Sequence, residues 1–137
     1  MKYLKRYNEN IRHNIDDDID DIFADLSDLD LRVVRQIQDR FIVVYICGQP
    51  LTDVNFYMKD IKNEVSHFIS KMEEDEHTLI SVRYRFRKDP HIYKSSAGNT
   101  TWKTLYPLWN GVKPIFTTPL NLDTSDLMDS FELKFTK

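Results

Sequence analysis

The chain has 137 residues, with 19 basic and 22 acidic side chains and a formal net charge of −3. This length favours one hydrophobic core over two independent ones, so we expect a single globular domain over residues 1–137. The slight acidic surplus offers no global attraction to nucleic acid or to an anionic membrane, and such binding would need a local patch. The longest apolar run, Phe41 to Cys47, is far shorter than the roughly 20 residues of a membrane span.

The N-terminus and the cysteine content favour an intracellular place of synthesis. Lys2, Lys5 and Arg6 are not followed by the hydrophobic segment of a secretory signal. The single cysteine cannot form an internal disulfide. Because Cys47 follows six apolar residues, we expect a buried structural thiol.

The first predicted element is an amphipathic helix from about Asn10 to Leu26. Its apolar stripe contains Ile11, Ile15, Ile19, Ile22, Phe23 and Leu26. Its outer face carries Asp16, Asp17, Asp18, Asp20, Asp21 and Asp25. Since aspartate is only a modest helix former, this helix needs a packing partner.

Two runs rich in β-branched residues follow, LRVVRQI and FIVVYIC, with Gln38 and Asp39 in the turn between them. They predict a hairpin, and the second run is apolar on both sides, which indicates a central strand. From Val54 to Met72 the apolar residues return to a helical period, and Thr52 or Asn55 could cap this second helix.

A strictly alternating run then predicts a strand with one buried and one basic face. Its buried side contains Ile80, Val82, Tyr84 and Phe86, and its other side contains Ser81, Arg83, Arg85 and Arg87. The closing run SFELKFTK predicts a final half-buried strand.

Residues from Pro90 to Asp129 show no period and predict a long irregular excursion, with one strand at Pro114 to Thr118. The expected fold is therefore α+β: a two-layer sandwich in which two helices cover one face of a mostly antiparallel sheet of four or five strands.

The sequence contains no complete catalytic or metal-binding pattern. Asp16, Asp18 and Asp20 fit the first ligand positions of a calcium loop, but Asp21 replaces the required glycine and Ser27 the required glutamate. The four histidines, His13, His67, His77 and His91, have no common zinc spacing. No nucleophile elbow or phosphate-binding loop is present in the sequence. We expect no cofactor and no enzymatic activity, and an enzyme with an unrecognised site stays open.

Two charged surfaces are the candidate contact sites. The first is basic and aromatic and contains Arg83, Arg85, Arg87, Lys88, Trp102, Tyr106 and Trp109. Arginines beside aromatic rings are typical of single-stranded nucleic-acid platforms and equally of protein interfaces. The second is the acidic face with Asp16, Asp17, Asp20 and Asp21, part of a segment of eight aspartates that ends at Asp30. It could dock on a basic surface, and the arginine row could be its complement in a neighbouring copy.

The opening MKYLKRYNEN resembles the start of small proteins of large tailed bacteriophages: Met-Lys, an apolar-aromatic pair, basic residues, an aromatic residue and Asn-Glu. It is also distantly similar to the capsid-targeting peptides of internal head proteins of such phages. It departs from those peptides because Lys5 and Arg6 stand in its middle and Tyr7, Asn8 and Glu9 replace the cleavage motif.

The resemblance implies a phage product in the virion or in the host cytoplasm. Our first hypothesis is a non-catalytic structural or accessory virion protein that binds other protein subunits, including copies of itself, and no membrane. The alternatives are a nucleic-acid-binding accessory protein that uses the Arg83, Arg85 and Arg87 face, and a small enzyme or host-defence antagonist.

Overall fold

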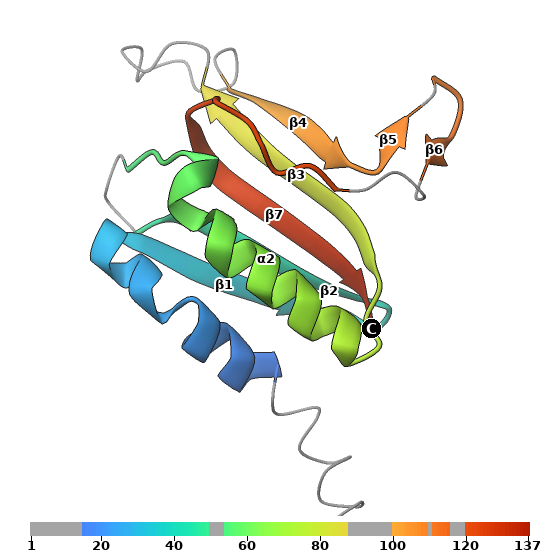
Figure 1. The fold of residues 1–137 in the computed structure, drawn as a ribbon, viewed down its shortest axis with the longest axis horizontal. Coiled ribbons are helices and arrows are strands. Elements are labelled where there is room, and N and C mark those ends of the chain that lie inside the picture. The colour runs from blue at the N-terminus through green and yellow to red at the C-terminus, as the bar shows by residue number, and fades with distance from the viewer. Residues whose placement is uncertain (1–14, 50–53, 88–99, 110, 116–119) are drawn as a thin grey trace, which may run out of the picture.

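A five-stranded antiparallel sheet, in the order β1-β2-β7-β3-β4, forms one layer of the protein (Figure 1). The computed structural model describes residues 15–49, 54–87, 100–109, 111–115 and 120–137. Two helices pack against one face of the sheet and contribute to the same hydrophobic core. The predicted two-layer α+β sandwich is thus confirmed.

The first half of the sheet is the predicted hairpin beside the last strand of the chain. β1 (Leu31–Ile37) pairs with β2 (Phe41–Gly48), and β2 also pairs with β7 (Met128–Thr136). The prediction that the second run is an interior strand is confirmed. Cys47 is half-buried, so the expected buried thiol was wrong: its side of β2 has no helix over it.

The second half of the sheet consists of β3 (Leu79–Arg87), which pairs with β7 and β4 (Thr100–Tyr106). A register shift between Leu79 and Ser81 interrupts the expected alternation. Because a bulge inserts one extra residue, Leu79 enters the core while Ile80 is only half-buried and lies outside the core cluster. The predicted buried side is otherwise correct.

The expected irregular excursion contains a full strand of the main sheet. β4 lies within it, and a separate small sheet joins β5 (Leu108–Trp109) to β6 (Pro114–Ile115). β6 falls inside the strand predicted at Pro114 to Thr118, of which residues 116–119 lie outside the described residues. β4 has no detectable period in the sequence because it is an edge strand with consecutive exposed side chains, Trp102 to Thr104.

The N-terminal helix is described over residues 15–22, and we call this segment the acidic helix. Ile15, Ile19 and Phe23 are buried as predicted, whereas residues 10–14 lie outside the described residues. The α-helix ends earlier than expected, because Ala24–Leu29 form a 3₁₀ helix, η1. Within η1 the Ser27 hydroxyl donates to the carbonyl of Ala24, a local bond that competes with regular α-helix.

The second helix, α2 (Met58–Glu74), lies along the sheet and buries the predicted apolar stripe from Met58 to Met72. It begins later than expected, because Phe56 pairs with Met128 through two backbone hydrogen bonds of 2.9 Å that keep this segment extended. Its N-cap is Tyr57, so the prediction of Asn55 was wrong, while Thr52 lies outside the described residues. The Asp60 carboxylate accepts a hydrogen bond from the backbone N–H of Tyr57, with 2.9 Å between the nitrogen and Oδ2.

The core lies between the helices and the sheet. The ring of Phe68 in α2 lies 5.2 Å from that of Phe23 and 5.8 Å from that of Phe135, measured between centroids, and so joins both helical segments to β7. Within the described residues, no helix has the length and apolar character needed to cross a bilayer.

Candidate interaction surface

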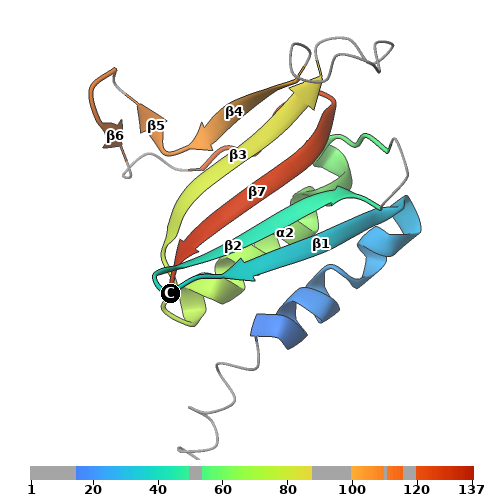
Figure 2. The same cartoon turned by 180° about the vertical axis from the view of Figure 1, so that it is seen from behind.

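The sheet face opposite the helices is the principal candidate surface, and we call it the open face. No element of the described chain covers it (Figure 2). Since side chains alternate between the faces of a strand, the register identifies which residues share it. One row crosses all five strands and consists of Val34, Tyr45, Glu132, Arg83 and Thr104.

At the centre of this row, Arg83 and Glu132 form a bidentate ion pair. The Arg83 Nε donates to Glu132 Oε1 at 2.8 Å and the second guanidinium nitrogen to Oε2 at 3.0 Å. Glu132 is only 4% exposed, while the Arg83 side chain is 42% exposed. Both carboxylate oxygens are therefore satisfied by one arginine, which gives a buried charge the geometry it needs.

Trp102 lies against this pair. The Arg83 guanidinium carbon is 4.5 Å from the centroid of the Trp102 ring, and that of Arg85 is 5.9 Å away. Arg85 also donates from Nε to Asp129 Oδ1 at 2.7 Å. Trp102 remains 37% exposed, so an exposed aromatic residue is held against two paired arginines.

Ionisation on the open face follows from the same contacts. Burial is the main cause that raises the pKa of Tyr45. The negative charge of Glu132 and a hydrogen bond from the Tyr45 hydroxyl to the Glu132 carboxylate raise it further. The hydrogen bonds to Glu132 raise the pKa of Arg83. The contacts with Glu132 therefore tie the Tyr45 phenol and the Arg83 guanidinium to one buried side chain at the centre of the open face.

The structure brings together three of the seven residues predicted for the basic and aromatic surface: Arg83, Arg85 and Trp102. Tyr106 was misplaced, because it is opposite Val82 in the register and packs against the core on the helix side. The register shift between β3 and β4 reverses the expected side. The side chains of Arg87 and Trp109, and the whole of Lys88, lie outside the described residues.

Sequence reasoning missed three partners of the arginines, namely Tyr45, Asp129 and Glu132. Glu132 alternates with Phe131 and Leu133, which correctly indicates the side of β7 away from the core. Nothing in that pattern shows that the site between β2 and β3 is closed to water. Only the strand order places Glu132 between Tyr45 and Arg83.

The predicted acidic face lies on the acidic helix, on the other side of the sheet from the open face. Asp16 is engaged within the molecule, since its Oδ1 lies 2.6 Å from the Nε of Arg35 in β1. Asp17, Asp20 and Asp21 are exposed. The pKa of the neighbouring Asp18 is raised, and burial of its carboxyl group is the main cause.

A second polar cluster joins the segment of residues 120–127 to the sheet. Asp126 accepts hydrogen bonds from the Tyr84 hydroxyl and, at 3.0 Å, from the Lys103 ammonium. The Tyr84 hydrogen bond is the main cause of the lowered pKa of Asp126, followed by that of Lys103. Leu122 of this segment is buried in the core. The cluster fastens a long connection onto the helix side of the sheet.

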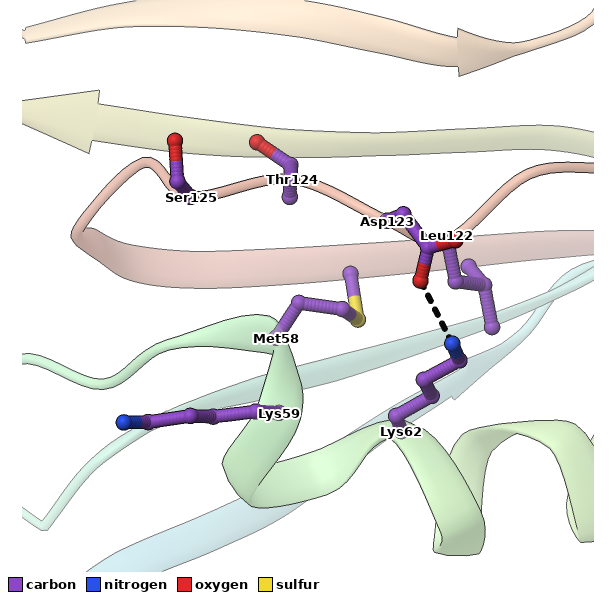
Figure 3. Close-up of a pocket in the computed structure, with 7 residues that line it drawn as sticks. All are labelled: Met58, Lys59, Lys62, Leu122, Asp123, Thr124 and Ser125. Carbon is purple, nitrogen blue, oxygen red and sulfur yellow. Dashed lines mark hydrogen bonds and ion pairs between the residues drawn. The ribbon is translucent and has the colours of Figure 1, made fainter.

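A pocket of about 410 Å³ lies between α2 and this segment (Figure 3). Its lining consists of Met58, Lys59, Lys62, Leu122, Asp123, Thr124 and Ser125. The Lys62 ammonium is paired with Asp123, and the Lys59 ammonium lies 5.4 Å from the centroid of the Tyr57 ring. Both cations of the lining are therefore engaged with neighbouring side chains.

Across the described residues, no three His, Cys, Asp or Glu side chains lie together as a metal site would require. No protein-family model, curated protein or solved structure matches the chain at a significant level. The geometry of the open face is therefore the main basis for a functional proposal.

Proposed function

We propose that this chain is a non-catalytic structural or accessory subunit of a bacteriophage particle and that it acts through protein contacts made by the open face. The phage setting is supported by the resemblance of the segment MKYLKRYNEN to phage proteins. The contact role is supported by one arrangement above all: Arg83, held by the buried Glu132, lies against the exposed ring of Trp102. Tryptophan and arginine are the residue types that contribute most to protein interfaces.

The charges immediately around Trp102 favour a protein partner over nucleic acid. Arg83 and Arg85, the two described arginines of the predicted row, already pair with Glu132 and Asp129. A phosphate would have to compete with these carboxylates and would be repelled by them. A protein partner needs no excess of positive charge, because aromatic and apolar contacts supply most of the binding free energy.

Particle composition tests this proposal directly. We expect mass spectrometry of purified phage particles to detect the chain in stoichiometric amount. Trp102→Ala should lower its amount at least tenfold, because the central aromatic anchor is lost. The matched control is Tyr57→Ala, since Tyr57 is also an exposed aromatic residue beside a cation but lies on the helix side. Absence of the wild-type chain from the particles contradicts the proposal.

Nucleic-acid binding is the second candidate, and the exposed ring of Trp102 on an open sheet face is the observation that favours it. It predicts binding to single-stranded DNA or RNA that weakens steeply with salt and is lost in the double variant Arg83→Ala with Arg85→Ala. Such a result would replace the protein-contact proposal. Binding that is weak and insensitive to these substitutions leaves the protein partner as the better account.

A further inference from the structure

We infer that the partner of the open face is a second copy of this chain, whose acidic helix lies across it, so that copies associate head to tail. This inference rests on the proposed function, because it identifies the partner of the same surface. It is argued from the charges that each surface leaves without a partner and from their positions on opposite sides of the sheet.

The acidic helix presents an uncompensated stripe of negative charge. Asp17, Asp20 and Asp21 are exposed and have the i, i+3 and i+4 spacing that places side chains next to one another on a helix. None of the three forms an ion pair with any described cation, whereas Asp16 does so with Arg35. Such a stripe attracts a cationic surface that can approach the whole helix at once.

Among the described residues, two cations of the open face are left over after its internal pairs are formed. Arg32 is exposed at the β1 edge of this face and makes no ion pair within the described chain. Lys134 on β7 lies over the ring of Phe41, 4.3 Å from the centroid, and likewise has no carboxylate partner among the described residues. The face therefore carries a positive surplus that complements the acidic stripe.

The dimensions of the two surfaces agree. Arg32 and Lys134 are two strands and four residues apart, which corresponds to roughly 17 Å between their Cα atoms. The eight helical residues 15–22 span about 12 Å, and long arginine and lysine side chains bridge the remainder. Five strands provide a width of about 19 Å, enough for a helix of about 10 to 12 Å diameter. The rings of Tyr45 and Trp102 would lie beneath or beside the docked helix.

The placement of the two surfaces determines the symmetry of the contact. The acidic helix lies on the helix side of the sheet and the open face on the other side (Figures 1 and 2). The two approach each other only at the β1 edge, where Asp20 and Arg32 line one pocket without forming an ion pair, so the helix cannot lie across the open face of its own molecule. Each copy therefore offers one surface to a copy before it and the other to a copy after it, which builds rings or filaments. A two-fold dimer of open faces would instead bring the surplus cations Arg32 and Lys134 of both copies together.

A complementation experiment distinguishes these arrangements. One variant neutralises the helix (Asp17→Asn, Asp20→Asn, Asp21→Asn) and the other neutralises the open face (Arg32→Gln, Lys134→Gln). By analytical ultracentrifugation at low salt, the wild-type chain should form oligomers and each variant alone should associate at least tenfold more weakly. Because each variant keeps the surface that the other has lost, their mixture should form a one-to-one dimer that grows no further.

The control for charge is Glu73→Gln with Glu76→Gln, which alters exposed acidic residues at and just beyond the end of α2, outside the acidic helix and the main sheet, and should leave association unchanged. A salt titration of the wild-type chain gives a second measurement that needs no variant. Because salt screens the charges of this contact, its association constant should fall by about tenfold between roughly 50 and 500 mM salt. The inference is overturned if the wild-type chain stays monomeric at low salt, if the mixed variants fail to form a dimer, or if neither variant weakens association. A monomeric chain that is still present in phage particles would refute this inference and leave the proposed function standing.

Discussion

The two faces of the main sheet are built from the same strands and stabilised in different ways. On the helix side of β7, Phe131, Leu133 and Phe135 are completely buried beneath the helices. On the open face the same strand carries Glu132 and Lys134, whose contacts are an ion pair and a cation-aromatic contact. The strand thus buries one set of side chains beneath the helices and presents the other set on the open face.

The free energies of the two kinds of contact differ. Complete burial of a large apolar side chain contributes about 1.5 to 3 kcal/mol, whereas an exposed ion pair contributes about 0 to 1 kcal/mol. Substitutions on the open face should therefore alter binding more than stability. Glu132 is the exception, because it is a charge buried on a face that is otherwise open.

The largest effect is expected in the core, at Phe68→Ala. This substitution removes the ring that packs against both Phe23 and Phe135, and should lower the free energy of unfolding by about 3 to 5 kcal/mol. Urea denaturation monitored by circular dichroism measures it, and Phe68→Leu, which keeps most of the volume, should lose much less. A loss below about 1 kcal/mol in the alanine variant would show that the ring is not a central packing element.

The next effect tests the one buried charge found on the open face. Arg83→Met keeps a long stem beside Trp102 but leaves the Glu132 carboxylate buried and unpaired, which should lower the free energy of unfolding by about 1 to 3 kcal/mol. Glu132→Gln should lose less, because the remaining Arg83 is exposed enough for water to hydrate it. Denaturation of both variants at pH 7 measures the two losses in unfolding free energy. A larger loss for Glu132→Gln than for Arg83→Met would contradict the view that the buried Glu132 needs Arg83 more than Arg83 needs Glu132.

A smaller effect should depend on pH and involves Asp126 on the helix side. Because the pKa of Asp126 is lowered in the folded state by Tyr84 and Lys103, its contribution is present at neutral pH. It should be lost as the pH falls below about 4 and through the folded-state pKa. Asp126→Asn should cost about 1 kcal/mol at pH 7 and flatten this part of the acid profile. A stability difference between variant and wild type that stays constant from pH 7 to pH 2 would refute the assignment.

The smallest effect on stability is expected for Trp102→Ala, the variant with the largest expected effect on particle incorporation. Loss of its contacts with Arg83 and Arg85 should lower the free energy of unfolding by about 0.5 to 1 kcal/mol, the range for exposed cation-aromatic contacts. Thermal denaturation measures it. A loss as large as that of Phe68→Ala would show that Trp102 belongs to the fold and would remove the contrast between the faces.

Prediction succeeded where a local pattern carries the information. The helical period from Met58 to Met72 and the alternation from Val82 to Phe86 each require burial on one side, and the structure provides it. Prediction failed where a contact from elsewhere in the chain overrides the pattern. The bridge between Phe56 and Met128 delays the start of α2 in this way.

The candidate surface shows the same division. Alternation in β3 was enough to place Arg83 and Arg85 on the side away from the core. It gave no sign of β4, because an edge strand exposed on consecutive residues has no burial period. The position of Trp102 beside the arginines therefore became evident only from the pairing of β3 with β4.

The amino-acid sequence by itself determined the α+β class, the apolar stripes of the helices and the basic side of β3, because each follows from burial over a few neighbouring residues. The tertiary structure decided that β7 lies between β2 and β3. That strand order aligns Tyr45, Glu132 and Arg83, which are far apart in the chain, in one row. Hydrogen bonding between strands distant in sequence creates such a row, and no periodicity within one strand encodes its neighbour.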